Sequence, residues 1–427
     1  MIRRLALAAA ALVAAFLPGA PAAAHPMPHS TVTLDVHDRS VSAELRLPAE
    51  DLALAAGSPP TAASSPAGGD VRRYLLAHFR PRTMAGAPWR VAIDRIEAAD
   101  GEQTATGPYR EWVIGASLSP PPGGDVRHFR LGYDAIVHQV VTHTVLVSVR
   151  QDWAAGRVEG DTQVGVLTVD RRTMTVPGLT VDLGPGSAGR GFLAMLRLGG
   201  THIVEGTDHL LFLLVLLLPA ALLATGRRWH GSAGGRRAVR RIGAVTLAFT
   251  AGHSAALAAS ALGHIELPAR PVEAFIAASI LIGATHAIRP LFPGREALVA
   301  GLFGLGHGMA FSFTLAELHL STGQLALSLL GFNLGIELVQ LLLVAMALPA
   351  IVLAARLPAQ PVLRIGGATV AAVAAAGWLA DRLGRPNPVA RLADTAGSHT
   401  AVVMIALFAA GLAGTIGRRM RSAVPTA

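Results

Sequence analysis

Four ionisable side chains stand at the head of a long apolar run in the second half of the chain. They are His202, Glu205, Asp208 and His209. The run 210–224 that follows is shorter than the roughly 20 residues that a helix needs to cross a membrane. We therefore expect a helix that begins near Leu198 and carries these polar groups into the bilayer. On one continuous helix, His202, Glu205 and His209 would share a face, with Asp208 to one side.

The energetic cost of such groups favours a functional site. An ionisable side chain at bilayer depth costs about 2.5–3.5 kcal/mol on insertion scales, and such residues are functional by default. The alternative is a helix end that dips into the headgroup region, where its polar side chains are simply solvated.

The composition limits the ligands that this site can offer. The 427-residue chain is 52% hydrophobic and 15% charged, which is typical of a membrane protein with a soluble portion, and it has no cysteine. Thiolate metal sites and disulfides are therefore excluded. Imidazole and carboxylate ligands suit nickel or cobalt, and also zinc or copper(II). The net charge is +9, but the basic residues are all arginines that cluster between apolar segments, which favours a membrane partner and argues against nucleic acid.

The N-terminus predicts a cleaved secretory signal peptide over residues 1–24. Two arginines precede a short apolar core, and small residues end the segment, as in a signal cleavage site. Cleavage after Ala24 would leave His25 at the mature N-terminus. Its amine and imidazole, with His29 close by, could chelate a metal; a solvated tail is the simpler alternative.

Residues 25–182 predict an all-β, β-sandwich-like domain outside the cytoplasm. Apolar and polar residues alternate on both sides of a turn at 37–40, which is the pattern of a hairpin. Strands are expected at 32–36, 41–47, 89–96, 112–118, 137–149 and 164–169, and a short helix at 71–79. His138 and His143 would then lie five apart on one strand and face opposite sides.

A linker at 183–197 leads to a predicted membrane domain of seven helices over 198–417, followed by a cytoplasmic tail at 418–427. The expected spans are 198–224, 242–262, 272–289, 297–318, 325–349, 362–381 and 399–417. The arginine-rich loop 226–241 places that side in the cytoplasm. The signal peptide, the seven spans and the arginine-rich loop together predict a multi-pass protein of a bacterial-type plasma membrane, with its N-terminal domain outside the cytoplasm.

Polar residues from several spans reach a common depth. At 1.5 Å per residue, they lie roughly 12 to 18 Å below the nearer surface, close to the midplane of the bilayer. They are His209, His253, His307, Asn333 and Glu337. Gln340 shares a face with Asn333 and Glu337, and small residues at 301, 304 and 308 favour close helix contact. Glu273 and His286 lie nearer the two mouths, as entrance and exit groups or as ordinary interfacial residues.

Five segments together resemble the hydrogenase/urease accessory membrane proteins of the HupE/UreJ family, in the branch with a large N-terminal domain. The segments are HIVEGTDHLLFL (202–213), TLAFTAGHSAAL (246–257), LPARPVEAFIAASI (267–280), LFGLGHGMAF (302–311) and GFNLGIELVQ (331–340). The resemblance implies a nickel or cobalt permease that supplies metalloenzymes, with His202, Asp208 and His209 in the first motif. Thr285-His286 departs from the acidic–amide pair more common in relatives, which bears on the choice of metal.

The leading hypothesis is thus a permease for a divalent transition metal, with a transporter favoured over an enzyme. Its proposed ligands are His202, Glu205, Asp208, His209, His253, His307, Asn333 and Glu337. An intramembrane zinc-dependent hydrolase is the second hypothesis, since Ser254 stands beside His253 and zinc on histidines can activate water. A metal-sensing or assembly protein whose β domain binds an extracytoplasmic partner is the third.

Overall fold

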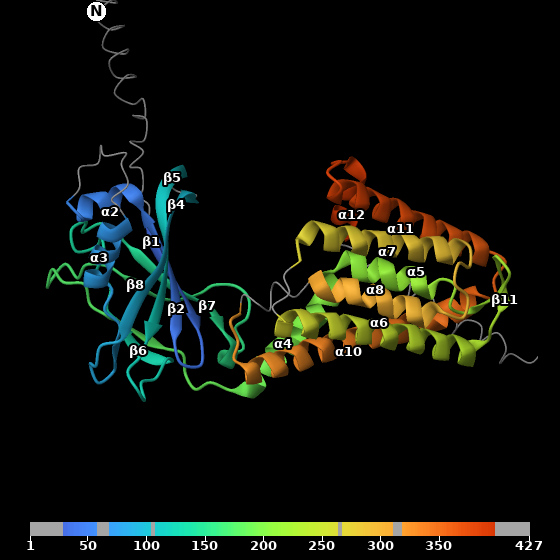
Figure 1. The fold of residues 1–427 in the computed structure, drawn as a ribbon, viewed down its shortest axis with the longest axis horizontal. Coiled ribbons are helices and arrows are strands. Elements are labelled where there is room, and N and C mark those ends of the chain that lie inside the picture. Colours follow the sequence, from blue (N-terminus) through green and yellow to red (C-terminus); the bar gives the residue numbers. More distant parts are fainter. Residues whose placement is uncertain (1–28, 58–67, 104–106, 264–266, 311–317, 398–427) are drawn as a thin grey trace, which may run out of the picture. The chain divides into compact units, whose positions relative to one another are not determined.

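The computed structural model describes residues 29–57, 68–103, 107–263, 267–310 and 318–397 (Figure 1). These residues form two compact units, one within Met1–Arg150 and Asp161–Leu183 and the other within Gln151–Gly160 and Gly184–Ala427. The predicted signal peptide, His25, the seventh predicted span and the predicted tail lie outside the described residues.

The first unit is β-rich, as predicted. Its elements in chain order are β1 (Ser30–Val36), β2 (Val41–Pro48), α2 (Ala49–Ala55), α3 (Gly68–His78), β3 (Arg82–Thr83), β4 (Arg90–Gln103), β5 (Gly107–Ser119), β6 (His128–Leu131), β7 (Val145–Asp152), β8 (Thr162–Leu167) and β9 (Leu179–Asp182). Six strands form one sheet in the order β4-β5-β2-β1-β7-β8, and β3-β6-β9 form a second. Buried side chains from both sheets share one hydrophobic core.

The predicted hairpin is confirmed. Strands β1 and β2 pair antiparallel from Val36 opposite Val41 outward, and the N–H of His37 donates to the carbonyl of Ser40 at 2.9 Å to close the turn. Alternation places apolar residues such as Leu34 in the core with no exposed surface.

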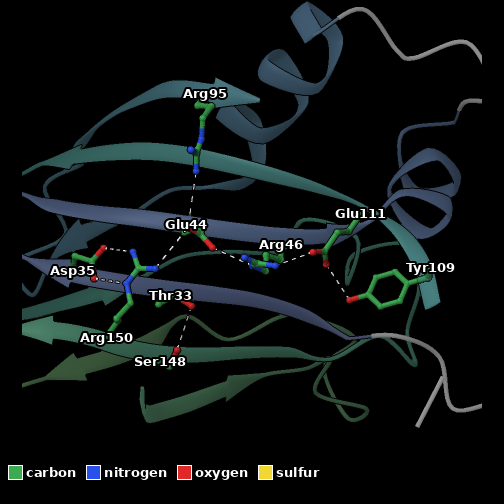
Figure 2. A network of polar contacts seen from close by, with 9 residues as sticks. All are labelled: Thr33, Asp35, Glu44, Arg46, Arg95, Tyr109, Glu111, Ser148 and Arg150. Atoms are coloured by element: carbon green, nitrogen blue, oxygen red, sulfur yellow. Dashed lines mark hydrogen bonds and ion pairs between the residues drawn. The ribbon is translucent and has the colours of Figure 1, made fainter. Parts of the chain in front are cut away.

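The opposite face of the large sheet is held by ion pairs, which Figure 2 shows. Arg150 reaches Asp35 at 2.6 Å, and Arg46 reaches Glu111 at 3.0 Å. The hydrogen bond from Arg150 to Asp35 raises the pKa of the guanidinium. Charged side chains on this face therefore find their partners on neighbouring strands.

The expected strand 137–149 is wrong in its first half, because β7 begins only at Val145. Residues 137–140 instead form a turn, in which the N–H of His138 donates to the carbonyl of Asp134 at 3.0 Å and that of Val140 to the carbonyl of Ile136 at 2.9 Å. His138 and His143 therefore belong to a turn segment rather than to opposite faces of one strand. His143 is buried between Ser30, at 2.7 Å, and Asp51, at 3.0 Å.

The second unit is mainly helical. Its elements are the short 3-10 helix η1 (Trp153–Ala155), α4 (Ala188–Glu205), α5 (Thr207–Leu217), β10 (Leu222–Thr225), β11 (Arg228–Ser232), α6 (Gly235–Gly263), α7 (Ala269–Ile288), α8 (Glu296–Ala310), α10 (Thr322–Ala354), α11 (Gln360–Arg382) and α12 (Pro388–Gly397).

Among the described helices, four are long and apolar enough to cross a membrane. They are α6, α7, α10 and α11. The pair α4 and α5 adds a fifth if a helix bent by 67° counts as one span. The predicted count of seven is therefore not confirmed, whereas the expectation of several helices that are long and apolar enough to span a membrane is.

The first predicted span is the main correction. The helix begins at Ala188, inside the predicted linker, and is interrupted at Gly206, whose backbone is extended with φ −72° and ψ 93°. It ends at Leu217, and the last predicted residues of the span belong to a β-hairpin with β11. The arginine-rich loop is correspondingly shorter, because α6 already begins at Gly235.

Glycines allow the closest helix contacts. Helix α6 packs on α8, and α4 packs on α10. A Cβ added to Gly304 or Gly308 would lie 2.2 Å from the carbonyl oxygen of Phe249 or His253 respectively. No side chain would fit at Gly304 or Gly308, so the expectation that small residues on α8 permit a close approach to α6 is confirmed.

Candidate metal centre

The imidazole of His209 lies between three other histidines. The centroid of its ring is 4.7 Å from that of His202, 5.1 Å from that of His307 and 6.1 Å from that of His253. These four rings come from α4, α5, α6 and α8, which are far apart in the chain. The bend at Gly206 faces the last turn of α4 towards the first turn of α5, so His202 and His209 meet across a helix break.

Two overlapping groups of side chains could each hold a metal ion. One consists of His202, His209 and His253, the other of Asp208, His209 and His307, and the ligand atoms within each group all lie within 4.8 Å of one another. Two nitrogens on one ion at bonds of 2.0–2.1 Å are at most about 4.2 Å apart. The widest separations in this range would therefore have to shorten when an ion binds. His209 belongs to both groups.

Asp208 orients the central imidazole. Its Oδ1 lies 3.0 Å from Nδ1 of His209, while Nε2 of His209 is buried with no hydrogen-bond partner among the described residues. A carboxylate acceptor holds the proton on Nδ1 and leaves the Nε2 lone pair available to a metal. Asp208 can therefore act as an orienting group or as a ligand.

Ser279 of α7 does the same for His307. The serine hydroxyl donates to the carbonyl of Ile276 at 2.7 Å, so its oxygen accepts from Nε2 of His307 at 3.1 Å. Because the proton then sits on Nε2, Nδ1 carries the lone pair. That Nδ1 is buried and has no described hydrogen-bond partner.

His253 is fully buried on α6, and the described residues provide no hydrogen-bond partner for either ring nitrogen. Buried polar groups are normally satisfied, and an unsatisfied one calls for an explanation such as an ion or a water molecule. Apolar rings of Phe212 and Phe249 pack against this group of histidines, each 5.2 Å from the ring of His307.

The polar residues of α10 lie beside the histidines without joining either group. Asn333 accepts from Ser254 at 2.7 Å, and Gln340 accepts from Thr250 at 3.1 Å. Both carboxylate oxygens of Glu337 are buried and have no described hydrogen-bond partner. These bonds tie α10 to α6.

Three predicted residues lie apart from the centre. Glu205 is exposed at the end of α4, because the break at Gly206 takes it off the face of His209. Glu273 forms an ion pair with Arg382 at 2.6 Å. His29 belongs to the first unit, where its N–H donates to Gln103 at 3.1 Å.

His286 belongs to a second polar group at the end of α7. Its ring stacks on Phe292 at 3.8 Å, and its Nε2 lies 3.9 Å from Glu296. Glu296 also forms an ion pair with Arg241. A pocket lined by Arg241, His286 and Glu296 opens here, apart from His209.

One comparison bears on identity. Residues 181–382 match the family model described as HupE / UreJ protein. This helical region belongs to the HupE/UreJ family. The match contains all five segments on which the resemblance was based, so that prediction is confirmed. No curated protein and no solved structure is similar enough to the chain to count as a match.

Sequence reasoning missed two residues of the HupE/UreJ region that shape the centre. The predicted continuous helix includes Gly206, although a glycine between polar residues is a common signal of a break. Ser279 carries no comparable signal, because one serine in an apolar helix more often bonds its own backbone. Here it does so and also holds His307.

Proposed function

We propose that the protein is a membrane permease or accessory protein that carries nickel or cobalt through the centre around His209. The observation that carries this proposal is the sharing of His209 between two groups of potential ligands. The kinship with the HupE/UreJ family supports the choice of metal, since that family is linked to nickel and cobalt handling.

The ligand chemistry fits a borderline divalent cation. Each group combines imidazole nitrogens, and one adds a carboxylate, while the chain has no cysteine. Such donors suit nickel, cobalt and zinc, and disfavour magnesium and calcium, which prefer oxygen. Zinc and copper(II) remain possible cargoes on the same chemistry.

The broken helix suggests how an ion could move. The ion would bind first to His202, His209 and His253, and then pass to Asp208 and His307 while His209 keeps hold of it. No step then leaves the ion without ligands in the apolar interior, where a bare charge is very costly. For an ion of charge +2, a potential of 100 mV that is negative inside supplies about 4.6 kcal/mol, twice the single-charge value.

The orientation belongs to the same proposal. The β-rich unit would lie outside the cytoplasm, and the arginine-rich segment around β11 inside. The ion would then enter from the side of the β-rich unit.

Uptake into proteoliposomes tests the proposal. With ⁶³Ni²⁺ outside and an inside-negative potential, the wild type should accumulate nickel, and His209→Ala should reduce uptake at least about tenfold, because loss of even an orienting partner costs 10- to 100-fold in metal affinity. His230→Ala, on the exposed β11 strand, is the matched control and should transport normally. Equal uptake by both variants would refute the proposal.

An intramembrane zinc hydrolase is the second candidate, favoured by the carboxylate of Asp208 beside the histidines, which could serve as a base for metal-bound water. The hydrolase hypothesis also relied on Ser254 as a neighbour of His253. The hydroxyl of Ser254 donates to Asn333 and not to His253, which weakens that part of the hypothesis. Hydrolysis of lipid or peptide substrates in the same proteoliposomes, with no nickel uptake, would favour the hydrolase.

A further inference from the structure

The pocket beside His286 continues from the histidine centre towards β11. Its lining includes two leucines of α5 and four polar residues of α6, α7 and α8, which are Leu213, Leu216, Arg241, Thr246, His286 and Glu296. Leu213 stands one turn after His209 on α5, and Thr246 stands two turns before His253 on α6. At 1.5 Å per residue, the pocket begins roughly 6 Å from His209 and roughly 10 Å from His253 along these helices. It therefore lies on the way from the centre to the arginine-rich side.

An ion pair closes the far end of this pocket. The guanidinium of Arg241 pairs with Glu296 and donates to the carbonyl of Leu222 at 3.1 Å. The N–H of Gly294 donates to the same oxygen of Glu296 at 3.0 Å. The side chain of Glu296 is 10% exposed, and that of Arg241 is 21% exposed. The carboxylate is thus the more buried partner, while the guanidinium that neutralises it lies nearer to solvent.

Strand β11 covers this ion pair. The indole N–H of Trp229 donates to the backbone carbonyl of His286 at 3.0 Å. The centroid of the Trp229 ring lies 5.2 Å from the guanidinium carbon of Arg241, which is a typical distance for a cation–π contact. Trp229 therefore fastens the hairpin to the end of α7 and holds Arg241 in place over the pocket.

His286 is unsuited to bind an ion in this pocket. Its Nδ1 accepts from the N–H of Leu291 at 3.1 Å and from that of Phe292 at 3.4 Å. A neutral imidazole that accepts at Nδ1 carries its proton on Nε2, so neither nitrogen has a lone pair to offer. The Nε2 of His286 lies 3.9 Å from Glu296, which is too far for a hydrogen bond. We therefore assign the cation-binding role in this pocket to the carboxylate of Glu296.

The interior of the pocket is polar enough to hold water. The Oγ1 of Thr246 and the Nε2 of His286 are both buried, and neither has a hydrogen-bond partner among the described residues. The free volume is about 10 Å³, close to the least that one water molecule requires. A cavity with several polar partners can hold water, whereas an apolar cavity of this size stays empty. These features fit a narrow passage in its closed form.

We propose that this pocket is the inner passage of the ion path and that Arg241 closes it as a tethered cation. The arriving divalent ion replaces the guanidinium at Glu296, and Arg241 moves out to solvent. The buried carboxylate then keeps a positive partner at every stage, as a buried charge requires. After the ion leaves, Arg241 returns, and its charge repels cations on the inner side. This inference rests on the proposed permease function.

Labelling of a single thiol tests the passage. The chain has no cysteine, so Thr246→Cys places one thiol in the pocket and breaks no described hydrogen bond. A membrane-impermeant methanethiosulfonate that carries a quaternary ammonium group should label it slowly in inside-out vesicles. Adding Arg241→Ala/Glu296→Gln removes the pair without leaving a buried charge. Labelling should then be at least about tenfold faster, because the closed form has lost the ion pair that favours it.

Two further variants control this experiment. Leu247→Cys, at the next residue of α6, replaces a side chain that is 59% exposed and faces lipid, so it should stay unreactive with and without the ion pair. Trp229→Phe removes the indole N–H that donates to His286 but keeps an aromatic ring. It should also speed the labelling of Thr246→Cys, and it keeps the test decisive if the variant without the ion pair does not fold.

Uptake of ⁶³Ni²⁺ separates this inference from the proposed function. Thr246→Cys should transport nickel before labelling and stop transporting once it is fully labelled. Equal labelling rates with and without the ion pair, labelling only in right-side-out vesicles, or normal uptake by the labelled protein would each overturn the inner passage. If the wild type accumulates no nickel while loss of the ion pair still speeds labelling, the permease proposal fails and the gated passage stands.

Discussion

At the scale of single residues, the geometry of the centre around His209 depends on Gly206, which has no Cβ atom. A Cβ on Gly206 would lie 2.6 Å from the carbonyl oxygen of His202 and 2.8 Å from Nδ1 of His209. We expect Gly206→Ala to push these two groups apart and to weaken nickel binding at least about tenfold, comparable to losing an orienting group. Gly243→Ala is the control, because a Cβ there meets nothing within 4 Å. Equal nickel affinity in calorimetry would contradict the role given to Gly206.

A second residue-scale prediction concerns the β-rich unit. Tyr133 is buried, and its hydroxyl has no hydrogen-bond partner among the described residues. Leaving a polar group unsatisfied costs about 1–3 kcal/mol, so Tyr133→Phe should keep or raise the melting temperature. Tyr109→Phe should lower it, because that hydroxyl donates to Glu111 at 3.0 Å. A clear loss of stability in Tyr133→Phe would indicate a partner for the hydroxyl.

The same residue predicts a pH effect with a definite sign. Burial raises the pKa of Tyr133 well above its usual value of 10.0. At a pH below 10.0, the Tyr133 side chain is neutral in both the folded and the unfolded chain. At a pH above 10.0, the unfolded chain loses this proton while the folded chain keeps it, so the wild type loses stability as the pH rises. Thermal unfolding of Tyr133→Phe should show a smaller loss between pH 9 and 11, and equal slopes would be evidence against this account.

At the scale of elements, the strands and helices that could be predicted are those with a clear periodicity or a long apolar segment. The β1–β2 hairpin follows from strict alternation, and α6, α7, α10 and α11 follow from long apolar segments. The break at Gly206 could not be predicted in this way, because hydropathy does not register an extended ψ inside an apolar run. The prediction placed three histidines at one depth, His209, His253 and His307, and their rings do lie close together. His202 was expected on the same helical face as His209, whereas the structure brings these two rings together across the bend at Gly206.

The α6–α8 contact gives a graded prediction at this scale. A Cβ on Gly308 would lie 2.2 Å from the carbonyl oxygen of His253, whereas a Cβ on Gly301 would lie 3.3 Å from that of Ala248. Overpacking costs about 1–3 kcal/mol, so Gly308→Ala should displace α6 and reduce both stability and nickel uptake. Gly301→Ala should do so much less. Thermal melting and uptake of the two variants would reveal the order, and a reversed order would contradict it.

At the scale of the whole molecule, the testable feature is orientation. Reporter fusions at Ser232 and at Ala390 should report opposite sides of the membrane, with Ser232 inside. If the fusions at Ser232 and Ala390 report the same side, the proposed direction of ion entry is wrong, while the geometry around His209 is unaffected.

A second prediction at this scale concerns cleavage of the signal peptide. N-terminal sequencing of the mature protein should begin at His25.

The segment Gln151–Gly160 affects how the β-rich unit can be produced as a separate fragment. Although it is flanked by β7 and β8, it belongs to the helical unit, where the indole N–H of Trp153 donates to Ser328 at 2.8 Å. A fragment that stops at Leu183 would thus carry a large aromatic side chain stripped of the surface it packs on, and such fragments tend to aggregate. Asp152 and Arg157 pair through both backbone bonds, at 2.8 and 2.9 Å. A short glycine–serine turn could therefore replace the residues between them and yield a soluble β fragment.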